Sequence, residues 1–570
     1  MTAVAEILLP LNPGIWLIVG ALIAVLLPQT LSRWFAVILP VFLIAFLFSL
    51  NLDNYGTISF FDYSLETFRL DALSRVFGLI FLIASALGNL FALGDDVDKL
   101  KRSAALAYAG GAIAAVFAGD MITLFIFFEV AAVASVFLIW ARRTERAFAA
   151  GMRYLIFQIG AGVILLAGLL IHFSVTGSID FDKLGLDAPG GILILIAFGI
   201  KSAFPLVHNW LQDAYPEATI SGTVILSGFT TKLAIYALAR SYAGTEILIW
   251  IGAVMAIFPI FYAIIENDLR RVLTYSLNNQ LGFMVVGIGI GTEMALNGTV
   301  SHAFVHILYK ALLLMSMGAV LLRTGTCNGT ELGGLVKTMP WTAAFCIVGA
   351  ASASAFPLFS GFISKSMIIT AAGEQGYWII WLILLFASAG VLYHSGIRIP
   401  YFAFFSEDKG HRVREAPWPM LVAMGAAAFL CIIIGVFPAP LYAMLPFSVD
   451  YVPYTAYHVI NQLQLLMFAA LAFTVLKLIK IYPSDTRGIN LDTDWVYRKG
   501  LMRLIIYSNR YLNTGYRVVC DGAVGIISEV INSAKHLGNN DGILSRTPAL
   551  GSSIAWISGL LLLVLLLRFA

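Results

Sequence analysis

Hydrophobic residues occur along this chain in stretches of about twenty, and these stretches follow one another almost without pause from Ile7 to Tyr482. One further apolar stretch covers residues 554–567. A helix of about 20 apolar residues is long enough to cross the hydrocarbon core of a bilayer, which is roughly 30 Å thick. The pattern therefore predicts an all-α polytopic membrane protein with about sixteen transmembrane helices.

The sixteen predicted spans are joined by short loops. Only 12% of the residues are charged, against roughly 25% in a soluble domain, which agrees with a membrane protein. Basic residues such as Lys99, Arg142 and Arg270 gather at the ends of odd-numbered spans, so the positive-inside rule places these ends in the cytoplasm and the N-terminus outside. The spans are 5–27, 34–52, 71–94, 103–119, 121–140, 152–174, 190–212, 217–243, 247–266, 271–290, 296–322, 341–371, 376–400, 417–437, 460–481 and 551–569.

The chain is predicted to contain three regions. No low-complexity segment or long linker interrupts residues 1–482, so we expect these residues to form one transmembrane domain. Residues 483–550 are expected to form a lateral amphipathic helix on the cytoplasmic side of the membrane. Residues 551–570 are expected to form an anchor helix that crosses the membrane.

The lateral helix is predicted from the pattern of residues 495–535. Lys499 and Arg503 lie on one face at 100° per residue, and apolar residues lie on the opposite face. Gly515 and Gly522 leave open whether this region forms one helix or two. Two interpretations remain for it: a surface helix on lipid headgroups, or a brace along neighbouring subunits.

Two lysines, Lys201 and Lys232, lie inside spans that are otherwise apolar. A charge at membrane depth costs roughly 2.5–3.5 kcal/mol, so a buried lysine indicates a functional site and requires a partner. Glu129 in another apolar span is the natural partner of Lys201, because pairing offsets part of the desolvation cost. We expect a change in this pairing to release or take up a proton. The alternative is a static ion pair that holds two helices together.

Two prolines are predicted to break membrane helices next to lysines. Pro205 follows Lys201 by one turn, and Pro357 precedes Lys365 by about two turns. Interrupted spans in corresponding halves of a chain indicate a transport site between inverted repeats. A repeat is a hypothesis here, because the two halves show no clear residue-level identity. His208 lies just beyond the first break and is a candidate for the same path.

One predicted helix carries three further candidates, His302, His306 and Lys310, within an arc of about 80°. We expect these residues to relay protons, because histidine titrates near neutral pH. Lys232 and His208 could continue this line toward Lys201. The alternatives are histidines that only hydrogen-bond between helices, or a metal site, although no acidic residue or third histidine accompanies the pair.

The sequence predicts no cofactor and no resident metal. Four cysteines, Cys327, Cys346, Cys431 and Cys520, lie far apart and form no disulfide, zinc or iron–sulfur pattern. No glycine-rich nucleotide loop occurs. We therefore expect any electron transfer to belong to partner subunits, and we expect no enzyme activity from this chain alone.

Several motifs resemble the antiporter-like subunits shared by respiratory complex I, membrane-bound hydrogenases and Mrp-type cation/proton antiporters. The similarity is carried by Glu129 in FFEVAAVASVFLIW, Lys201 in GIKSAFPLVHNWLQDAYPEA, Lys232 in TTKLAIYALAR, and the string NDLRRVLTYSLNNQLGFM. The segments AFPLFSGFISKSMI and IRIPYFAFFSED most resemble the D-type subunit of Mrp antiporters. The lateral helix and its anchor are instead similar to the most distal pump subunit of complex I and to its hydrogenase counterpart.

The resemblance implies a 14-helix core with two inverted five-helix repeats, each a half-channel. It implies a role for each matching residue. Glu129 and Lys201 are the pair of the first half-channel, Lys232 is the connector, and Lys365 is the terminal proton site. His302, His306 and Lys310 are the central relay.

From this resemblance, together with the buried charged residues, we expect a proton-translocating subunit of a multisubunit Mrp-type sodium/proton antiporter in the cytoplasmic membrane of a prokaryote. Its expected partners are small and large membrane subunits, lipid and protons, with sodium as a further candidate ion. Two alternatives remain. One is the pump subunit of a redox-driven complex, and the other is a proton-coupled membrane partner in inorganic-carbon uptake.

Overall fold

The computed structural model describes residues 11–60, 63–95, 98–479, 490–539 and 550–569. The chain divides into two compact units, Met1–Asn490 and Leu491–Ala570. Among the described residues, eleven helices are long and apolar enough to cross a membrane, and three shorter apolar helices accompany them. The prediction of an all-α polytopic membrane fold is confirmed. Parts of the predicted regions, namely residues 1–10, 61–62, 96–97, 480–489, 540–549 and 570, lie outside the described residues.

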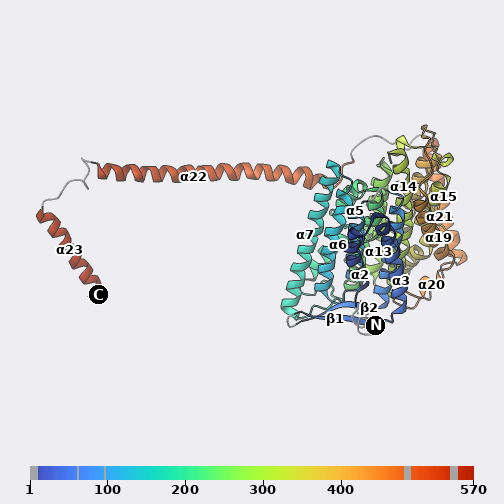
Figure 1. Ribbon diagram of the computed structural model, residues 1–570, viewed down its shortest axis with the longest axis horizontal. Helices are drawn as coiled ribbons and strands as arrows, with labels where there is room; N and C mark the ends of the chain where they lie inside the picture. The colour runs from blue at the N-terminus through green and yellow to red at the C-terminus, as the bar shows by residue number, and fades with distance from the viewer. Residues whose placement is uncertain (1–10, 61–62, 96–97, 480–489, 540–549, 570) are drawn as a thin grey trace. The chain divides into compact units, whose positions relative to one another are not determined.

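The first unit is a bundle of helices that run side by side (Figure 1). Its first half contains α2 (Pro13–Leu26), α3 (Gln29–Ser49), α4 (Ala72–Ala92), α5 (Lys99–Val116), α6 (Met121–Trp140), α7 (Glu145–Thr176), α8 (Gly191–Lys201), α9 (Asn209–Ala214), α10 (Ile220–Gly228), α11 (Thr230–Ser241) and α12 (Ile247–Ile265). Its second half contains α13 (Leu269–Ile290), α14 (Glu293–Thr324), α15 (Pro340–Ala353), α16 (Ser360–Glu374), α17 (Trp378–Val391), the π-helical η4 (Leu392–Ile397), α18 (Arg398–Pro400), the π-helical η5 (Tyr401–Phe405), α19 (Trp418–Val436), α20 (Ala439–Tyr442) and α21 (Ala456–Leu478). The 3-10 turns are η1 (Tyr215–Glu217), η2 (Gly329–Glu331) and η3 (Leu335–Lys337).

Polar side chains and glycines fix where several of these helices begin and end. Asp120 accepts a hydrogen bond from the Thr123 backbone N–H and begins α6, and Thr292 does the same for α14 through Ala295. Gly291 and Gly325 adopt left-handed conformations and end α13 and α14. The apolar spans are thus separated by residues that satisfy the free ends of each helix.

Three of the predicted spans are each divided into two helices, and a proline break was predicted for two of them. The predicted span 190–212 is divided between α8 and α9, and the predicted span 341–371 is divided between α15 and α16. The third span, 217–243, is interrupted at Phe229, whose ψ of −71° bends the chain between α10 and α11. The first two breaks contain the predicted prolines. The third contains none, so the pattern did not indicate it.

The two proline breaks share one pentapeptide, Ser-Ala-Phe-Pro-Leu, at residues 202–206 and 354–358. Its alanine and leucine have positive φ at both places, 62° and 73° in the first break and 57° and 73° in the second. Such φ values are uncommon for residues with a side chain and cost on the order of 1–3 kcal/mol each. The shared pentapeptide is a residue-level identity between the two halves that the hydrophobic pattern does not register, and it supports the hypothesis of a repeat.

A pair of β-strands occupies residues 53–60 and 63–70, where the pattern predicted only a short loop. Strand β1 (Asp53–Phe60) pairs antiparallel with β2 (Tyr63–Leu70), with Asp53 opposite Leu70. The second strand also bonds to the α5–α6 connection, because Arg69 N–H donates to Phe117 O at 2.7 Å. The apolar residues of this segment largely alternate with polar ones at the strand period of two, so the predicted short loop is instead a two-stranded sheet within an otherwise helical domain.

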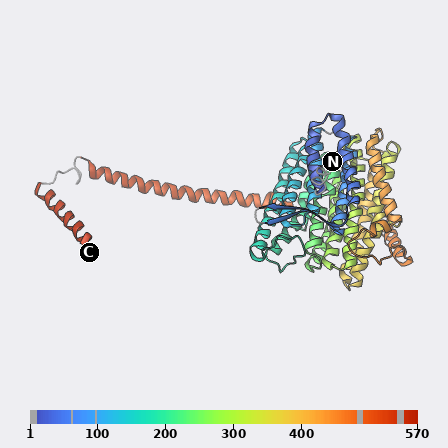
Figure 2. The ribbon, with the colours of Figure 1, turned by 60° about the horizontal axis from the view of Figure 1, so that its bottom comes forward.

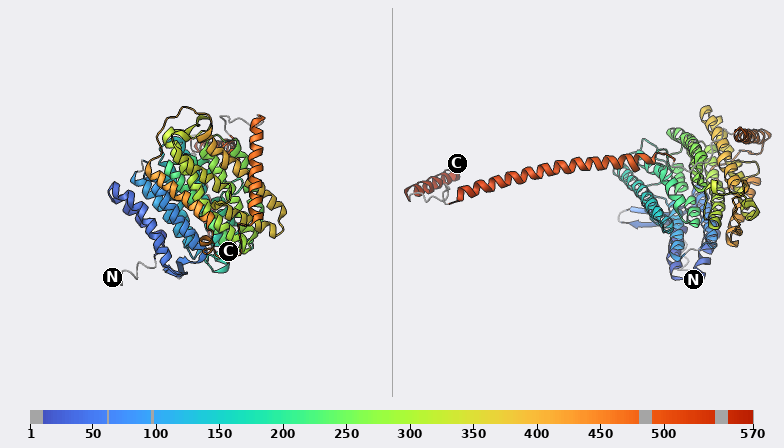
Figure 3. Two further views of the ribbon diagram at one scale, coloured as in Figure 1. Left: turned by 90° about the vertical axis from the view of Figure 1, so that its right-hand side faces the viewer. Right: turned by 90° about the horizontal axis from the view of Figure 1, so that it is seen from above.

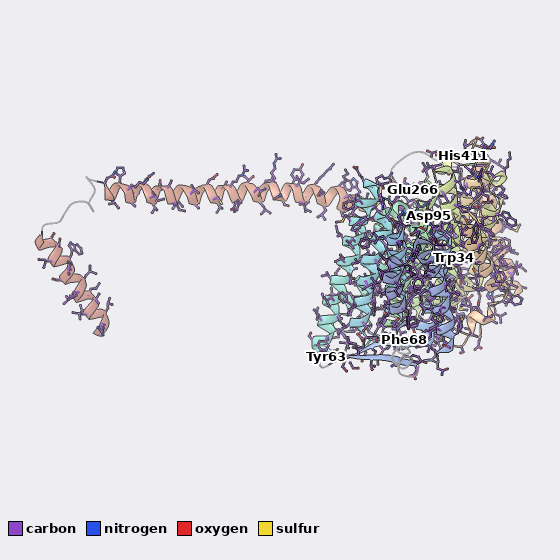
Figure 4. The ribbon with its side chains drawn as sticks, in the orientation of Figure 1. Trp34, Tyr63, Phe68, Asp95, Glu266 and His411 are labelled. Carbon is purple, nitrogen blue, oxygen red and sulfur yellow. The ribbon has the colours of Figure 1, made fainter. Side chains whose placement is uncertain are left out.

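Connections that were predicted to share one side of the membrane do lie at one end of the bundle. Figure 4 places Asp95, Glu266 and His411 toward that end, and Tyr63 and Phe68 of strand β2 toward the other. Asp95 lies between α4 and α5, Glu266 between α12 and α13, and His411 between η5 and α19. The arrangement agrees with the alternation of basic loops. The assignment of this end to the cytoplasm stays a prediction.

Helix α14 joins the two halves of the bundle. It packs against α4, α10 and α11 of the first half and against α15, α16 and α19 of the second. Figure 2 shows α2 and α3 (blue) side by side, and Figure 3 shows from above the second half (yellow to orange) lying beside the first (cyan to green). A residue on α14 can therefore contact groups from both halves.

The second unit contains one long helix, α22 (Met502–Gly538), preceded by the π-helical η6 (Val496–Leu501), and a separate apolar helix, α23 (Leu550–Phe569). Helix α22 has 37 residues, which corresponds to about 55 Å. It continues through Gly515 and Gly522 without a break. The amphipathic region that the pattern predicts is thus a single helix.

Glycines bring α12 and α13 into close contact. A methyl group on Gly252 would lie 2.6 Å from Val286 N, and one on Gly282 would overlap the backbone of Ala256. Small residues allow membrane helices to approach this closely. The contact positions α13 against the rest of the bundle.

We predict that Gly282→Val destabilises the bundle by about 1–3 kcal/mol, because the added methyl groups cannot enter the α12–α13 contact without displacing backbone. Thermal unfolding of the purified protein in detergent measures the effect. Gly160→Val is the matched control, since no atom lies within 4 Å of the corresponding position on α7. Equal unfolding temperatures for the two variants would show that the contact is not tight.

Candidate functional site

Three buried lysines lie next to the breaks in the helices, and the ammonium groups of two of them contact the carboxyl end of half a helix. Lys201 is the last residue of α8. The Lys232 ammonium donates a hydrogen bond to Ser227 O in the last turn of α10 at 2.6 Å, and the Lys365 ammonium donates to Ala353 O at the end of α15 at 3.0 Å. The last carbonyls of a helix have no partner within the helix, and the helix dipole makes this end negative. The breaks between α10 and α11 and between α15 and α16 therefore each offer a negative site to a cation inside the membrane.

Lys201 also contacts the expected acidic partner. Its Nζ atom lies 3.3 Å from Glu129 Oε1 and 4.9 Å from the centroid of the Phe128 ring. The lysine side chain is 1% exposed, whereas that of Glu129 is 23% exposed. Glu129 faces a groove of about 710 Å³ between α5 and α6, lined by residues that include Leu100 and Phe125. The carboxylate can thus be reached from outside the bundle, and the lysine cannot.

Gly162 on α7 leaves room for the Glu129 carboxylate. A methyl group at Gly162 would overlap Oε1 of Glu129. The neighbouring Gly160 on the same helix has no atom within 4 Å of its corresponding position. Gly162 therefore helps to fix the position of Glu129 relative to Lys201, and nothing in the sequence pattern indicated it.

The predicted relay residues lie fully buried on α14. The ring centroids of His302 and His306 are 6.1 Å apart. His302 Nδ1 lies within hydrogen-bond distance, 2.9 Å, of Ser364 Oγ on α16, which is adjacent to Lys365. In the part of the chain that the structure describes, neither ring nitrogen of His306 has a hydrogen-bond partner. The two histidines are therefore not both held by bonds between helices.

Lys310 is bonded to the neighbouring helix α13. Its ammonium donates a hydrogen bond to Ser276 Oγ at 2.8 Å. One residue before it, Tyr309 OH donates to Gln280 Oε1 at 3.0 Å. The polar positions of α13 thus serve as hydrogen-bond partners for α14.

The packing of the helices gives these residues a spatial order. Helix α8 packs against α11, α11 packs against α14, and α14 packs against α16. Lys232 interacts electrostatically with Lys310 and His306 across the α11–α14 contact, and His302 interacts with Lys365 across the α14–α16 contact. We call this series the polar row. It consists of Glu129, Lys201, Lys232, His306, Lys310, His302 and Lys365.

His208, the remaining candidate, packs against α12. Its ring centroid lies 4.6 Å from that of Phe258, and the side chain is buried. It stands at the amino end of α9, directly after the first break. Its place beside the break agrees with the sequence pattern, whereas its contact with Phe258 could not be inferred from it.

Sequence reasoning missed the serines that link the polar row to its surroundings. Ser364 precedes a candidate lysine directly, which was an available signal. Ser276 lies in the quoted string on α13, but serine in a membrane helix often bonds only to its own backbone, so the pattern does not single it out. Among the described residues, no group of three or more histidine, cysteine or carboxylate side chains could hold a metal ion.

Comparison with known proteins gives matches over much of the chain. Residues 118–390 match the family model described as NADH:quinone oxidoreductase/Mrp antiporter, TM. The D-type subunit of the Na+/H+ antiporter of Alkalihalophilus pseudofirmus is 31% identical over 349 residues, which cover 57% of this chain and 70% of that protein. Hydrogenase-4 component B of Escherichia coli is 27% identical over 425 residues, which cover 66% of this chain and 63% of that protein.

A solved structure shares the fold. The structure of the Mrp complex from Dietzia sp. matches with a TM-score of 0.67 and 21% identity, over 76% of this chain and 95% of the matched chain. The chain is therefore a multi-pass membrane protein that belongs to the NADH:quinone oxidoreductase/Mrp antiporter family, in which it resembles the D-type subunit of Mrp antiporters.

Proposed function

We propose that this chain is a proton-translocating subunit of a multisubunit Mrp-type sodium/proton antiporter. The observation that carries the proposal is the polar row, which places four lysines and two histidines in a continuous series of packed helices within the membrane. Buried ionisable groups are costly there and mark ion pathways. The similarity to the D-type subunit of the Na+/H+ antiporter of Alkalihalophilus pseudofirmus supports the choice of complex.

The pair Glu129–Lys201 is proposed to couple charge to proton movement. While the carboxylate is charged and near, it stabilises the ammonium of Lys201 in a medium of low dielectric constant. When the carboxylate is neutralised or drawn away, the ammonium loses that stabilisation and gives its proton to the next group of the row. The proton then passes by way of Lys232 to the α14 residues and on to Lys365.

Partner subunits are proposed to act through the groove at Glu129. The carboxylate is reachable from this groove, so a charged or polar group on a neighbouring subunit could pair with it in place of Lys201. The apolar lining of the groove suits a membrane helix of that subunit. The expected partners are thus membrane proteins of the same complex.

A second candidate function is the pump subunit of a redox-driven complex. The similarity to Hydrogenase-4 component B extends over 66% of this chain, and α22 followed by α23 forms a long C-terminal extension. In this case the same polar row would carry protons, and electron transfer would occur in partner subunits. The two candidates differ in their partners rather than in the proton path.

We predict that Lys201→Ala lowers proton flux at least tenfold while the complex still assembles, because the substitution removes the titrating partner of Glu129. Flux is measured with a pH-sensitive dye in inside-out vesicles that contain the intact complex, and assembly is measured by native electrophoresis. Lys183→Ala is the control, since that lysine is exposed in a loop. Normal flux in Lys201→Ala would reject the proposed pathway.

We predict that Gly162→Ala reduces flux several-fold, because the added methyl group displaces the Glu129 carboxylate from Lys201. Gly160→Ala, two residues away on the same helix, should transport at the rate of the unaltered protein. The same vesicle assay compares the two variants. If both behave alike, Gly162 does not position the carboxylate.

We predict that the chain, tagged at its C-terminus and extracted gently from native membranes, co-purifies with hydrophobic membrane subunits and with no redox protein. Mass spectrometry of the co-purified proteins gives the result. Iron–sulfur, flavin or nickel proteins in stoichiometric amounts would instead establish the second candidate function. A lone soluble zinc protein would favour inorganic-carbon uptake.

A further inference from the structure

A buried histidine lies outside the polar row, on the π-helical segment η4. His394 and the adjacent Ser395 are both fully buried, and His394 Nδ1 lies 2.8 Å from Ser395 Oγ. In an α-helix, adjacent side chains diverge by about 100°. A π-helical turn is wider and occurs frequently at functional sites. Here it accompanies two adjacent polar side chains that bond to each other inside the bundle.

Hydrogen bonds connect this histidine to the central lysine. Ser395 Oγ lies 2.7 Å from Ser276 Oγ on α13, and Ser276 Oγ accepts a hydrogen bond from the Lys310 ammonium at 2.8 Å. Together with the bond between Ser395 and His394, three consecutive contacts lead from α14 through α13 to η4. The four side chains are all buried, so the connection lies wholly inside the bundle.

A glycine allows η4 to lie deep in the bundle. A methyl group on Gly396 would overlap Ser354 Oγ, at the second break. The segment also contacts α13 and α15. Because Gly396 has no side chain, η4 can approach α15 closely while Ser395 reaches Ser276.

The donors and acceptors of this connection fit a proton wire. An ammonium group only donates, a hydroxyl donates once and accepts twice, and a neutral imidazole can accept at one nitrogen. When Lys310 donates to Ser276, Ser276 can donate to Ser395, and Ser395 can donate to Nδ1 of His394. Every hydroxyl proton then points away from the lysine and toward the histidine.

We propose that His394 carries protons on a branch that leaves the polar row at Lys310. The Lys310 ammonium gives one proton to the Ser276 hydroxyl, which passes its own proton to Ser395, and Ser395 passes its proton to His394 Nδ1. The products are a neutral lysine and an imidazolium, and no further reactant is needed. The proposal rests on the proposed function of the polar row.

Charge repulsion would make the proton transfer between Lys310 and His394 reversible. It would also prevent the two side chains from being charged at the same time. The charged groups that interact with His394 are Lys310, Lys365 and Arg398, and all three are cationic. Positive charges repel one another more strongly in a medium of low dielectric constant than in water. A proton can therefore reside on His394 only after Lys310 has released its own, and it returns or moves on when Lys310 is charged again.

The branch points toward the end of the bundle that contains Glu266. Nε2 of His394 has no hydrogen-bond partner among the described residues, so one nitrogen is available to pass the proton on. One turn further along the chain, the buried Arg398 donates hydrogen bonds to the carbonyls of Ala263 and Glu266 at the end of α12. Figure 4 shows Glu266 at that end. The branch thus leads from Lys310 toward the part of the chain whose buried Arg398 is bonded to the end of α12.

The test compares four variants of the intact complex in the vesicle assay, namely His394→Gln, Ser276→Ala, Lys310→Ala and the control His172→Gln. His394→Gln keeps a side chain that can bond to Ser395 but cannot become protonated, and Ser276→Ala interrupts the wire while leaving the histidine in place. We expect each to lower proton flux at least tenfold with normal assembly. His172→Gln is the control, because this histidine lies on α7 and contacts the Pro189 carbonyl. It should transport at the rate of the unaltered protein.

The outcomes distinguish a failure of the proposed branch at His394 from a failure of the proposed proton pathway along the polar row. Normal flux in His394→Gln, together with loss of flux in Lys310→Ala, would overturn the branch and leave the proposed function intact, because it would show that His394 serves only as a hydrogen-bonding side chain. Normal flux in Lys310→Ala would reject the proposed function itself. If His394→Gln does not assemble, Ser276→Ala decides alone, and normal flux in that variant would overturn the branch.

Discussion

The cost of holding an ammonium group inside a membrane governs this structure. Lys232 and Lys365 offset that cost by donating to carbonyl groups at the carboxyl end of half a helix, where the helix dipole is negative, whereas Lys201 pairs with Glu129. A continuous helix would use those carbonyls in its own hydrogen bonds. The breaks in the helices and the charges at them therefore depend on each other. A lysine stabilises the open helix end, and the open end stabilises the lysine.

The stabilisation is partial, and the remaining interactions differ from one lysine to the next. Lys201 has a carboxylate partner that is itself accessible from a groove, whereas Lys310 is bonded to a neutral serine and lies on an unbroken helix. The charge on Lys201 can consequently be controlled from outside the chain, and the charge on Lys310 responds to its buried neighbours. Because of this difference, a neighbouring subunit can change the charge at the Glu129–Lys201 end of the polar row. Lys310, in the middle of the row, can exchange protons with its buried neighbours.

The sequence alone predicted the residues that are rare in a membrane. Lys201, Glu129 and the histidines of α14 stand out because charged and polar side chains interrupt long apolar spans, and proline marks two of the breaks. The third break, at Phe229, depends on backbone dihedral angles that many residues can adopt. Ser276 could not be identified either, because its importance comes from which helix α13 faces. The break at Phe229 and the role of Ser276 depend on packing between segments that are distant in the sequence. The periodicity of apolar residues within one segment contains no information on that packing.

The stability of the long helix α22 depends on contacts outside the helix rather than on its own sequence. Gly515 and Gly522 have no neighbouring atoms that would require glycine, and each weakens a helix by roughly 0.5–1 kcal/mol relative to alanine, yet the helix is continuous. Arg503 and Arg510 repeat along one face, which prevents α22 from crossing a bilayer. Apolar residues such as Leu512 are exposed along the opposite face. An isolated helix with such a face gains little by folding in water, so its stability depends on an apolar surface that covers this face.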